Sequence, residues 1–206
     1  DDVTARLDLL DSYLRDFDAP PTPPTSEVAT QPRRYTEPVR VVAPFPASDA
    51  EAAPEAASHM VMLSWLLNEE PLSQVDELAL NILDQLLMGT RTAELYKPLM
   101  ESGLGAAVIG GGLSDELKQA TFSAGLKGVK KEDVAKVEPL VRASLAGVVE
   151  RGFEPDAIEA AVNTLEFQLR EMNTGGFPKG LAFMLSAMPR WIRRPSGEDV
   201  AGARRL

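Results

Sequence analysis

Four prolines fall within five residues near the start of this chain, at positions 20, 21, 23 and 24. A proline has no backbone N–H and its ring clashes with the preceding helical turn, so neither a helix nor a central strand passes through such a cluster. We therefore predict an extended linker over residues 19–37. It separates a helical piece at residues 1–18 from a domain at residues 38–192, which a basic tail at residues 193–206 follows.

Apolar residues at spacings of three and four predict the helices of this chain. The stripe of Val3, Leu7, Leu10 and Leu14 predicts a helix over residues 1–17. The same pattern recurs in five later segments, at residues 71–88, 92–101, 132–151, 155–172 and 178–191. Pro139 lies inside the third of these later segments, where we expect it to kink the helix.

Short β-branched or alternating runs predict the strands. Such runs occur at residues 38–44, 60–67, 106–109 and 116–126. In the last run, Ala120, Phe122, Ala124 and Leu126 alternate with polar residues, as in a strand with one buried face. Residues 47–58 are rich in Ala, Glu and Asp and are expected to form a surface excursion between the first two strands. Strands without regular helical crossovers favour an α+β fold, with a mainly antiparallel sheet and helices packed on one face.

Cysteine and histidine usage limits the chemistry of this chain. It has no cysteine, and His59 is its one histidine. A thiolate site, a disulfide and a cysteine nucleophile are therefore excluded, and a zinc site usually needs two or three imidazoles. No G-x-S-x-G motif supports a serine nucleophile. We predict no catalytic residue, no metal ligand and no cofactor within the chain.

The formal net charge of −10, from 31 acidic and 21 basic residues, disfavours a nucleic-acid partner. A cationic peptide partner fits this charge, as does an acidic surface that serves only solubility. No apolar run approaches the roughly 20 residues that span a bilayer, so no membrane partner is expected. The absence of an initiating Met and of an N-terminal targeting segment favours an internal or processed piece of a longer protein.

Three consecutive glycines, Gly110, Gly111 and Gly112, form the most conspicuous local feature. A phosphate-binding loop would need a lysine or a following helix, whereas here Asp115 and Glu116 follow and would repel phosphate. Two interpretations remain open: a hairpin turn, or a place where a peptide backbone comes close because side chains are absent. Acidic pairs elsewhere in the chain are expected to be solvated surface.

Several longer motifs resemble a known family. In chain order they are HMVMLSWLLNEEPL at 59–72, ESGLG at 101–105, VIGGGLSDE at 108–116, FSAGLKGV at 122–129, VERGF at 149–153, TLEFQLR at 164–170 and NTGGFPKGL at 173–181. Together these motifs closely resemble the presequence proteases, which are pitrilysin-type (inverzincin) zinc metallopeptidases, in their plant and algal form. The likeness runs from about Val3 to about Ile192.

The resemblance implies a place in a larger enzyme. Enzymes of this family contain four homologous α+β domains in two halves, which close around a chamber for unfolded peptides. Their zinc motif, H-x-x-E-H with a distal Glu, lies in the first domain, whereas this chain resembles the second and carries no catalytic residue. Zinc then belongs to the parent enzyme. The implied partners are its remaining domains and unfolded basic peptides such as cleaved organelle targeting peptides, in the mitochondrial matrix, the chloroplast stroma or both.

The resemblance also implies a candidate substrate-binding site. In the related insulin-degrading branch, a glycine-containing edge strand of the second domain pairs with the substrate main chain. The matching segment here is residues 110–122, which we expect to form an exposed sheet edge. The candidate residues are Gly110, Gly111, Gly112, Asp115, Glu116, Thr121 and Phe122. Targeting peptides are rich in Arg and poor in acidic residues, so Asp115 and Glu116 match them in charge.

The sequence leaves two alternatives open. A non-catalytic scaffold subunit of a processing-peptidase-like complex would share the fold, and a free-standing peptide-binding fragment would share the surface. The sequence that flanks this chain would distinguish them, because an upstream H-x-x-E-H motif identifies a peptidase parent.

Overall fold

The computed structural model describes residues 2–18, 35–46, 58–171 and 174–193. The chain divides into two units, Asp1–Thr30 and Gln31–Leu206. The division falls within the predicted linker at residues 19–37. Most of this linker lies outside the described residues. Residues 47–57 of the predicted excursion and residues 194–206 of the predicted tail also lie outside them.

Residues 2–18, the described part of the first unit, contain one helix, α1 (Val3–Leu14), as the apolar spacing predicts. Asp2 caps this helix, because its side chain accepts a hydrogen bond from the Thr4 N–H at 2.9 Å. The predicted apolar stripe is largely exposed within the unit; Leu7, for example, is 59% exposed.

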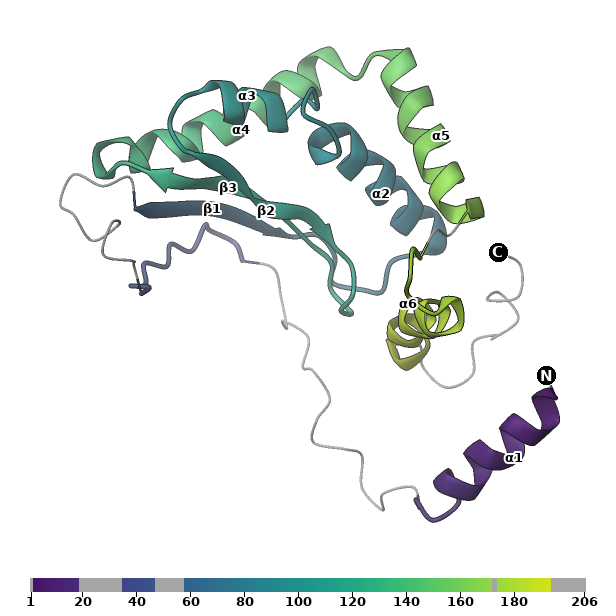
Figure 1. Cartoon of the computed structure of the whole chain (residues 1–206). Coiled ribbons are helices and arrows are strands. Elements are labelled where there is room, and N and C mark those ends of the chain that lie inside the picture. The colour runs from purple at the N-terminus through teal and green to yellow at the C-terminus, as the bar shows by residue number, and fades with distance from the viewer. Residues whose placement is uncertain (1, 19–34, 47–57, 172–173, 194–206) are drawn as a thin grey trace. The chain divides into compact units, whose positions relative to one another are not determined.

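A three-stranded sheet forms the framework of the second unit (Figure 1). Its strands are β1 (His59–Leu66), β2 (Ala107–Ser114) and β3 (Thr121–Val129). The spatial order is β1-β3-β2, and both pairings are antiparallel. Alternate residues of β3 are almost completely buried, since Ala124 and Leu126 are each 0% exposed. The period-two pattern of the sequence therefore identified the buried face of this strand correctly.

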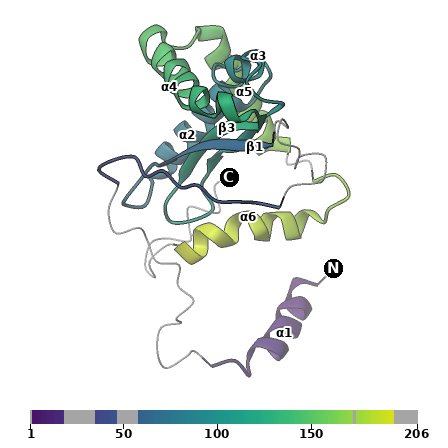
Figure 2. The same cartoon turned by 90° about the vertical axis from the view of Figure 1, so that its left-hand side faces the viewer.

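Helices cover one face of the sheet. The second unit contains α2 (Gln74–Met88), α3 (Tyr96–Glu101), α4 (Val134–Arg151), α5 (Pro155–Glu171) and α6 (Lys179–Arg193), and a short 3₁₀ turn, Lys131–Asp133, precedes α4. In Figure 1 and Figure 2, α3 and α4 lie over the same side of the sheet. The helix α4 packs on β1 and β3, whereas α2 packs on β2 and α5. This arrangement confirms the predicted α+β class with a mainly antiparallel sheet.

The hydrophobic core lies between the sheet and these helices. It consists of Leu87, Leu95, Leu99, Phe122, Ala124, Leu126, Val129, Val137, Val141 and Val148. The opposite face of β1 is open in the described part of the chain, where Met60 and Met62 are 52% and 56% exposed. No helix in the described ranges is both long and apolar enough to cross a membrane.

Three of the four predicted strands differ from the structure. Residues 38–44 form no strand, and Val41 and Val42 are more than 80% exposed. A β-branched run favours extended backbone, but a strand also needs a neighbour to pair with, which the sequence pattern does not report. The strand predicted at 106–109 continues to Ser114, and the strand predicted from Glu116 begins only at Thr121, because residues 115–120 connect β2 to β3.

Candidate functional site

The three glycines lie within the edge strand of the sheet. Gly110, Gly111 and Gly112 belong to β2, whose only neighbour among the described strands is β3. The segment 110–122, expected to form an exposed sheet edge, is therefore divided: residues 110–114 lie on the edge strand β2, whereas Thr121 and Phe122 lie on β3, the central strand. The interpretation of the glycines as a hairpin turn is wrong, since the turn comes after them. An edge strand, and not a loop, carries the glycine run.

The glycines form a bulge in the pairing between β2 and β3. Ile109 faces Gly125 and Gly112 faces Ser123, so two residues of β2 lie opposite one residue of β3. All three glycines have positive φ, at 113°, 75° and 72°, a region that residues with a Cβ rarely adopt. A bulge of this kind bends an edge strand and interrupts its ladder of hydrogen bonds.

Space around the bulge differs from one glycine to the next. A Cβ at Gly110 would collide with the backbone of Ser123, whose hydroxyl donates a hydrogen bond to the Gly110 carbonyl. A Cβ at Gly111 would meet nothing within 4 Å, and this residue is exposed. Gly111 is therefore the point of the bulge that another backbone can approach.

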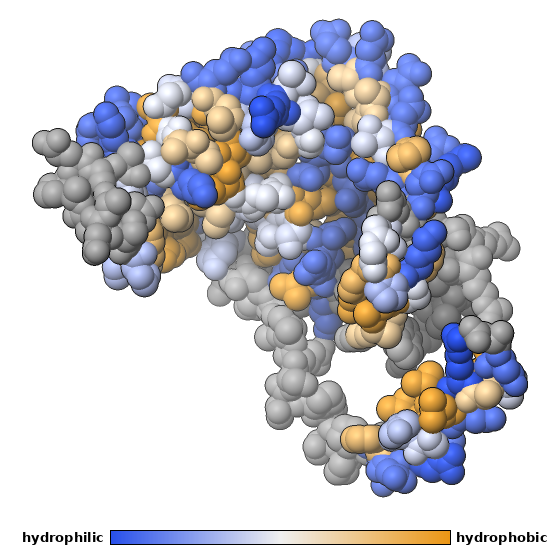
Figure 3. Space-filling view, viewed as in Figure 1, coloured by the Kyte–Doolittle hydropathy of each residue, from blue (hydrophilic) through white to orange (hydrophobic). Residues whose placement is uncertain are grey.

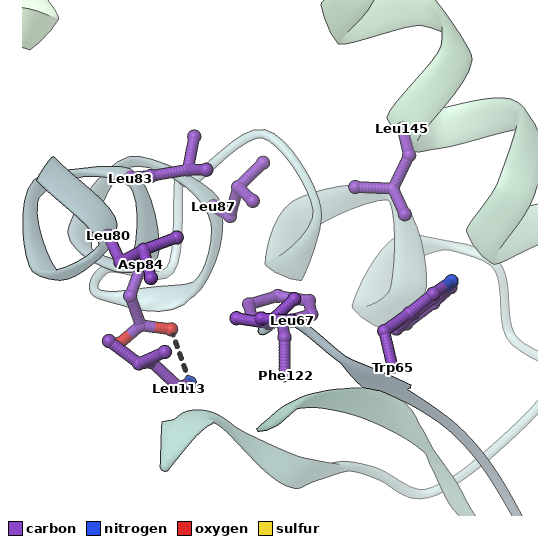
Figure 4. A pocket seen from close by; sticks show the side chains of 9 residues that line it. All are labelled: Trp65, Leu67, Leu80, Leu83, Asp84, Leu87, Leu113, Phe122 and Leu145. Carbon is purple, nitrogen blue, oxygen red and sulfur yellow. Dashed lines mark hydrogen bonds between the residues drawn. The ribbon is translucent and has the colours of Figure 1, made fainter. Parts of the chain in front are cut away.

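Asp84 of α2 holds the other side of the bulge. Its Oδ1 accepts a hydrogen bond from the Leu113 N–H at 2.9 Å (Figure 4), and a Cβ at Gly112 would collide with the same oxygen. Burial raises the pKa of the Asp84 carboxyl above its ordinary value, and the hydrogen bond from Leu113 opposes that rise. The carboxylate thus contacts the edge strand at the residue that comes after the glycines.

The remaining predicted site residues are divided between surface and core. Asp115 and Glu116 lie in the connection after β2, and Asp115 Oδ2 is 3.5 Å from the Nδ2 of Asn81 on α2. Thr121 and Phe122 begin β3, but Phe122 is only 9% exposed. Its ring lies 6.0 Å from the ring of Trp65, centroid to centroid, so its side chain belongs to the core.

A cavity of about 220 Å³ lies beneath the bulge, between α2, α4 and the sheet. Figure 4 shows the side chains that line it, which are Trp65, Leu67, Leu80, Leu83, Asp84, Leu87, Leu113, Phe122 and Leu145. Asp84 is the one charged residue among them. We did not predict its role from the sequence, although a signal was present: Asp84 follows Leu80 by four residues and therefore lies on the apolar face of its helix.

The polar outer surface lies away from this site. In Figure 3, hydrophilic residues cover the upper side of the second unit, over α4 and α5. Ion pairs between neighbouring helical turns, such as Arg142 with Glu138 at 2.9 Å, are part of that surface. Exposed pairs of this kind contribute little to stability.

The described residues do not fit a zinc site. Among them, no group of three or more His, Cys, Asp or Glu side chains lies close enough together to hold a metal ion. His59 begins β1, and its Nδ1 is buried without a hydrogen-bond partner in the described structure. A lone imidazole in that position provides one potential ligand, fewer than a zinc site requires.

Comparison with protein families matches residues 2–165 of the chain to the peptidase M16 inactive domain. Among individual proteins, the chain is 47% identical over 193 residues to "Presequence protease 1, chloroplastic/mitochondrial" of Arabidopsis thaliana. That alignment covers 93% of this chain and 18% of the Arabidopsis protein.

Animal and bacterial proteins are also similar. "Presequence protease, mitochondrial" of Mus musculus is 33% identical over 126 residues, which is 61% of this chain and 12% of the mouse protein. "Protein HypA" of Clostridium perfringens is 34% identical over 115 residues, which is 56% of this chain and 12% of that protein. The chain thus spans less than a fifth of the length of these relatives.

Proposed function

The chain belongs to the peptidase M16 family, and from this membership we propose that it is the substrate-holding domain of a longer zinc metallopeptidase that degrades cleaved targeting peptides. The matched family model is that of an inactive domain, so the chain is a non-catalytic part of a peptidase. Zinc and the residues that cleave the peptide belong, in this proposal, to another domain. The names of the Arabidopsis and mouse relatives support a location in mitochondria and chloroplasts.

The observation that carries the proposal is the glycine bulge on an edge strand. An extended peptide can add to a sheet edge through main-chain hydrogen bonds, which are independent of the peptide sequence. β2 offers such an edge, and Gly111 leaves space for a second backbone. A peptidase that degrades many targeting peptides needs this kind of sequence-tolerant contact.

Charge supports a basic substrate. Asp115 and Glu116 come directly after β2, and the whole chain has a formal net charge of −10. Targeting peptides are rich in Arg and poor in acidic residues. Acidic side chains beside the edge would therefore attract such peptides and increase their rate of association, most strongly at low salt.

The open face of the sheet supports the proposal that this domain lies beside the chamber of the larger enzyme. Met60 and Met62 are both more than half exposed on β1, on the face opposite the helices. Methionine side chains are flexible and adapt to different apolar partners. In the proposal this face lines the chamber and contacts the apolar side chains of an unfolded peptide.

A binding measurement with the 206-residue chain tests the proposal. We expect a fluorescent Arg-rich, acid-poor peptide to bind weakly, because a short edge buries far less than the roughly 1,000 Å² of a stable interface. Gly111→Val should weaken this binding about fivefold to tenfold, since the branched side chain blocks the approach of a second backbone and removes one or two hydrogen bonds.

Gly103→Val is the matched control. Gly103 also has positive φ, at 67°, and a Cβ there would also meet nothing within 4 Å, but it precedes β2 and lies outside the bulge. Both substitutions strain the backbone, so the control separates damage to the fold from loss of the binding edge. Equal loss of binding in both variants, or no binding by the unaltered chain, would remove the basis for a peptide-holding role.

A further inference from the structure

We propose that Asp84 is a positioning residue that decides which part of β2 a peptide can pair with. It engages the Leu113 N–H and holds the glycine bulge in place, so that the open part of the edge is Ala107–Ile109, ahead of the bulge. The inference rests on the proposed function, because it concerns the edge at which the peptide is held.

The hydrogen bond between Asp84 and Leu113 links two elements that are distant in the sequence. The two residues are 29 positions apart, and the bond joins the middle of α2 to the end of β2. A strand that added to this edge would need main-chain donors such as the Leu113 N–H. Since a carboxylate oxygen already accepts from that donor, an added strand cannot use it unless Asp84 moves away.

Gly112 is required for this contact. The Oδ1 of Asp84 lies where a Cβ at position 112 would be, so the carboxylate reaches the edge strand only because that residue has no side chain. Gly112 has positive φ, and the N–H that follows it, that of Leu113, donates to this carboxylate on α2. Asp84 and Gly112 therefore act as a pair, which explains the position of the last glycine in the run.

The other end of the bulge is fixed from the central strand. Ser123 Oγ donates to the Gly110 carbonyl, and the Ser123 backbone fills the space where a Cβ at position 110 would lie. The bulge is thus held by β3 on one side and by α2 on the other. Gly111, between the two contacts, is the one glycine of the run with open space beside it.

This arrangement limits the length and the register of a bound peptide. Main-chain pairing extends over the three residues before the bulge and ends there, because the bulge bends the strand and Asp84 engages the Leu113 N–H. The peptide then passes through the open space beside Gly111 without pairing. The acidic groups of Asp84 and Asp115 then lie where the peptide leaves the edge. A basic residue in the peptide is favoured at that point.

Two substitutions of Asp84 separate its hydrogen bond from its charge. Asp84→Asn keeps an oxygen that can accept from Leu113 and removes the charge, whereas Asp84→Ala removes both. Glu138→Gln is the control, since Glu138 is an exposed acidic residue on α4 that pairs with Arg142 and does not contact β2. All four proteins are compared as the 206-residue chain.

The first readout is amide hydrogen exchange at Leu113, measured by NMR. We expect Asp84→Ala to increase this exchange rate about tenfold or more, and Asp84→Asn and Glu138→Gln to leave it close to that of the unaltered chain. Exchange at Val137 and Val141, which are both 0% exposed in the core, is recorded in the same sample. It reports whether the variant is folded.

The second readout is the segment of β2 that an Arg-rich peptide protects from exchange. In the unaltered chain we expect protection at Ala107–Ile109, and in Asp84→Ala we expect it to extend into residues 112–114. Unchanged Leu113 exchange in a folded Asp84→Ala variant, or identical protected segments in both proteins, would overturn the role of Asp84. A different result is also informative: the unaltered chain binds no peptide, but Leu113 exchange increases in Asp84→Ala as expected. That result would overturn the proposed function and the role of Asp84 in peptide binding. The bond between Asp84 and Leu113 would then be a structural contact only.

Discussion

Asn68 shows how one polar side chain can organise a corner of the sheet. It is the only buried polar residue among those described, at 6% exposed. Its Nδ2 donates to the carbonyls of Glu70 and Lys118, at 2.8 and 3.0 Å, and its Oδ1 accepts from the Ala120 N–H at 2.6 Å. These bonds tie the end of β1 to the connection between β2 and β3, which contains Asp115 and Glu116.

Asn68→Ala should lower the free energy of unfolding by about 2–3 kcal/mol, because it leaves several backbone groups near the corner without their partner. Urea denaturation followed by circular dichroism measures the change. Asn81→Ala provides a comparison, since Asn81 is half-buried on α2 and its Nδ2 donates to the Glu77 carbonyl at 2.8 Å within the same helix and, at the longer distance of 3.5 Å, to Asp115. We expect that variant to lose less than about 1 kcal/mol. Similar losses in the two variants would contradict the role of Asn68.

At the scale of elements, apolar periodicity predicted the helices well. Each of the six predicted helices occurs. The largest differences are in α1, which covers Val3–Leu14 where residues 1–17 are predicted, and in α3, which starts at Tyr96 and not at Thr92. Such patterns are informative because a helix that packs on a sheet must present one apolar face to it. The strands were predicted less well, since pairing depends on residues distant in the sequence.

The helix α4 contains a proline, Pro139, in its interior. Pro139 is exposed, while Val137 and Val141 on either side of it are buried against the sheet. A proline in a helix interior removes a backbone hydrogen bond and is unfavourable relative to alanine. Pro139→Ala should therefore raise the free energy of unfolding, by about 1–3 kcal/mol.

Urea denaturation also measures this effect. Substitution of the adjacent exposed residue, as in Glu138→Gln, should change stability by less than about 0.5 kcal/mol. Destabilisation by Pro139→Ala would contradict the prediction.

At the scale of the whole molecule, this chain is proposed to hold a peptide, and that proposal assigns cleavage to other domains. Its single histidine and the absence of cysteine limit metal binding, and the described residues contain no metal-binding cluster. The chain spans 18% of the length of the Arabidopsis presequence protease.

The purified 206-residue chain is therefore expected to bind no stoichiometric zinc and to cleave no peptide. Metal analysis after dialysis, together with a fluorogenic peptide assay, tests both expectations. A zinc content near one ion per chain, or turnover that a chelator abolishes, would contradict them.

The sequence by itself determined which segments form helices, the α+β class and the family. Periods of two and 3.6 residues, with glycines and prolines between them, are local properties and can be read from neighbouring residues. The resemblance to presequence proteases, which rested on motifs such as NTGGFPKGL, is confirmed by the family and protein comparisons. The same motifs drew attention to the glycine run, although its binding role remains a prediction.

Only the tertiary structure decided how the glycine run is used. Which strand lies at the edge depends on the pairing order β1-β3-β2, and no local pattern specifies that order. The contact between Asp84 and Leu113 joins residues 29 positions apart, and the bulge depends on the register between β2 and β3. Strand order, register and contacts between distant residues depend on how the whole chain buries its apolar surface, and for that reason the three-dimensional fold was needed to locate the edge.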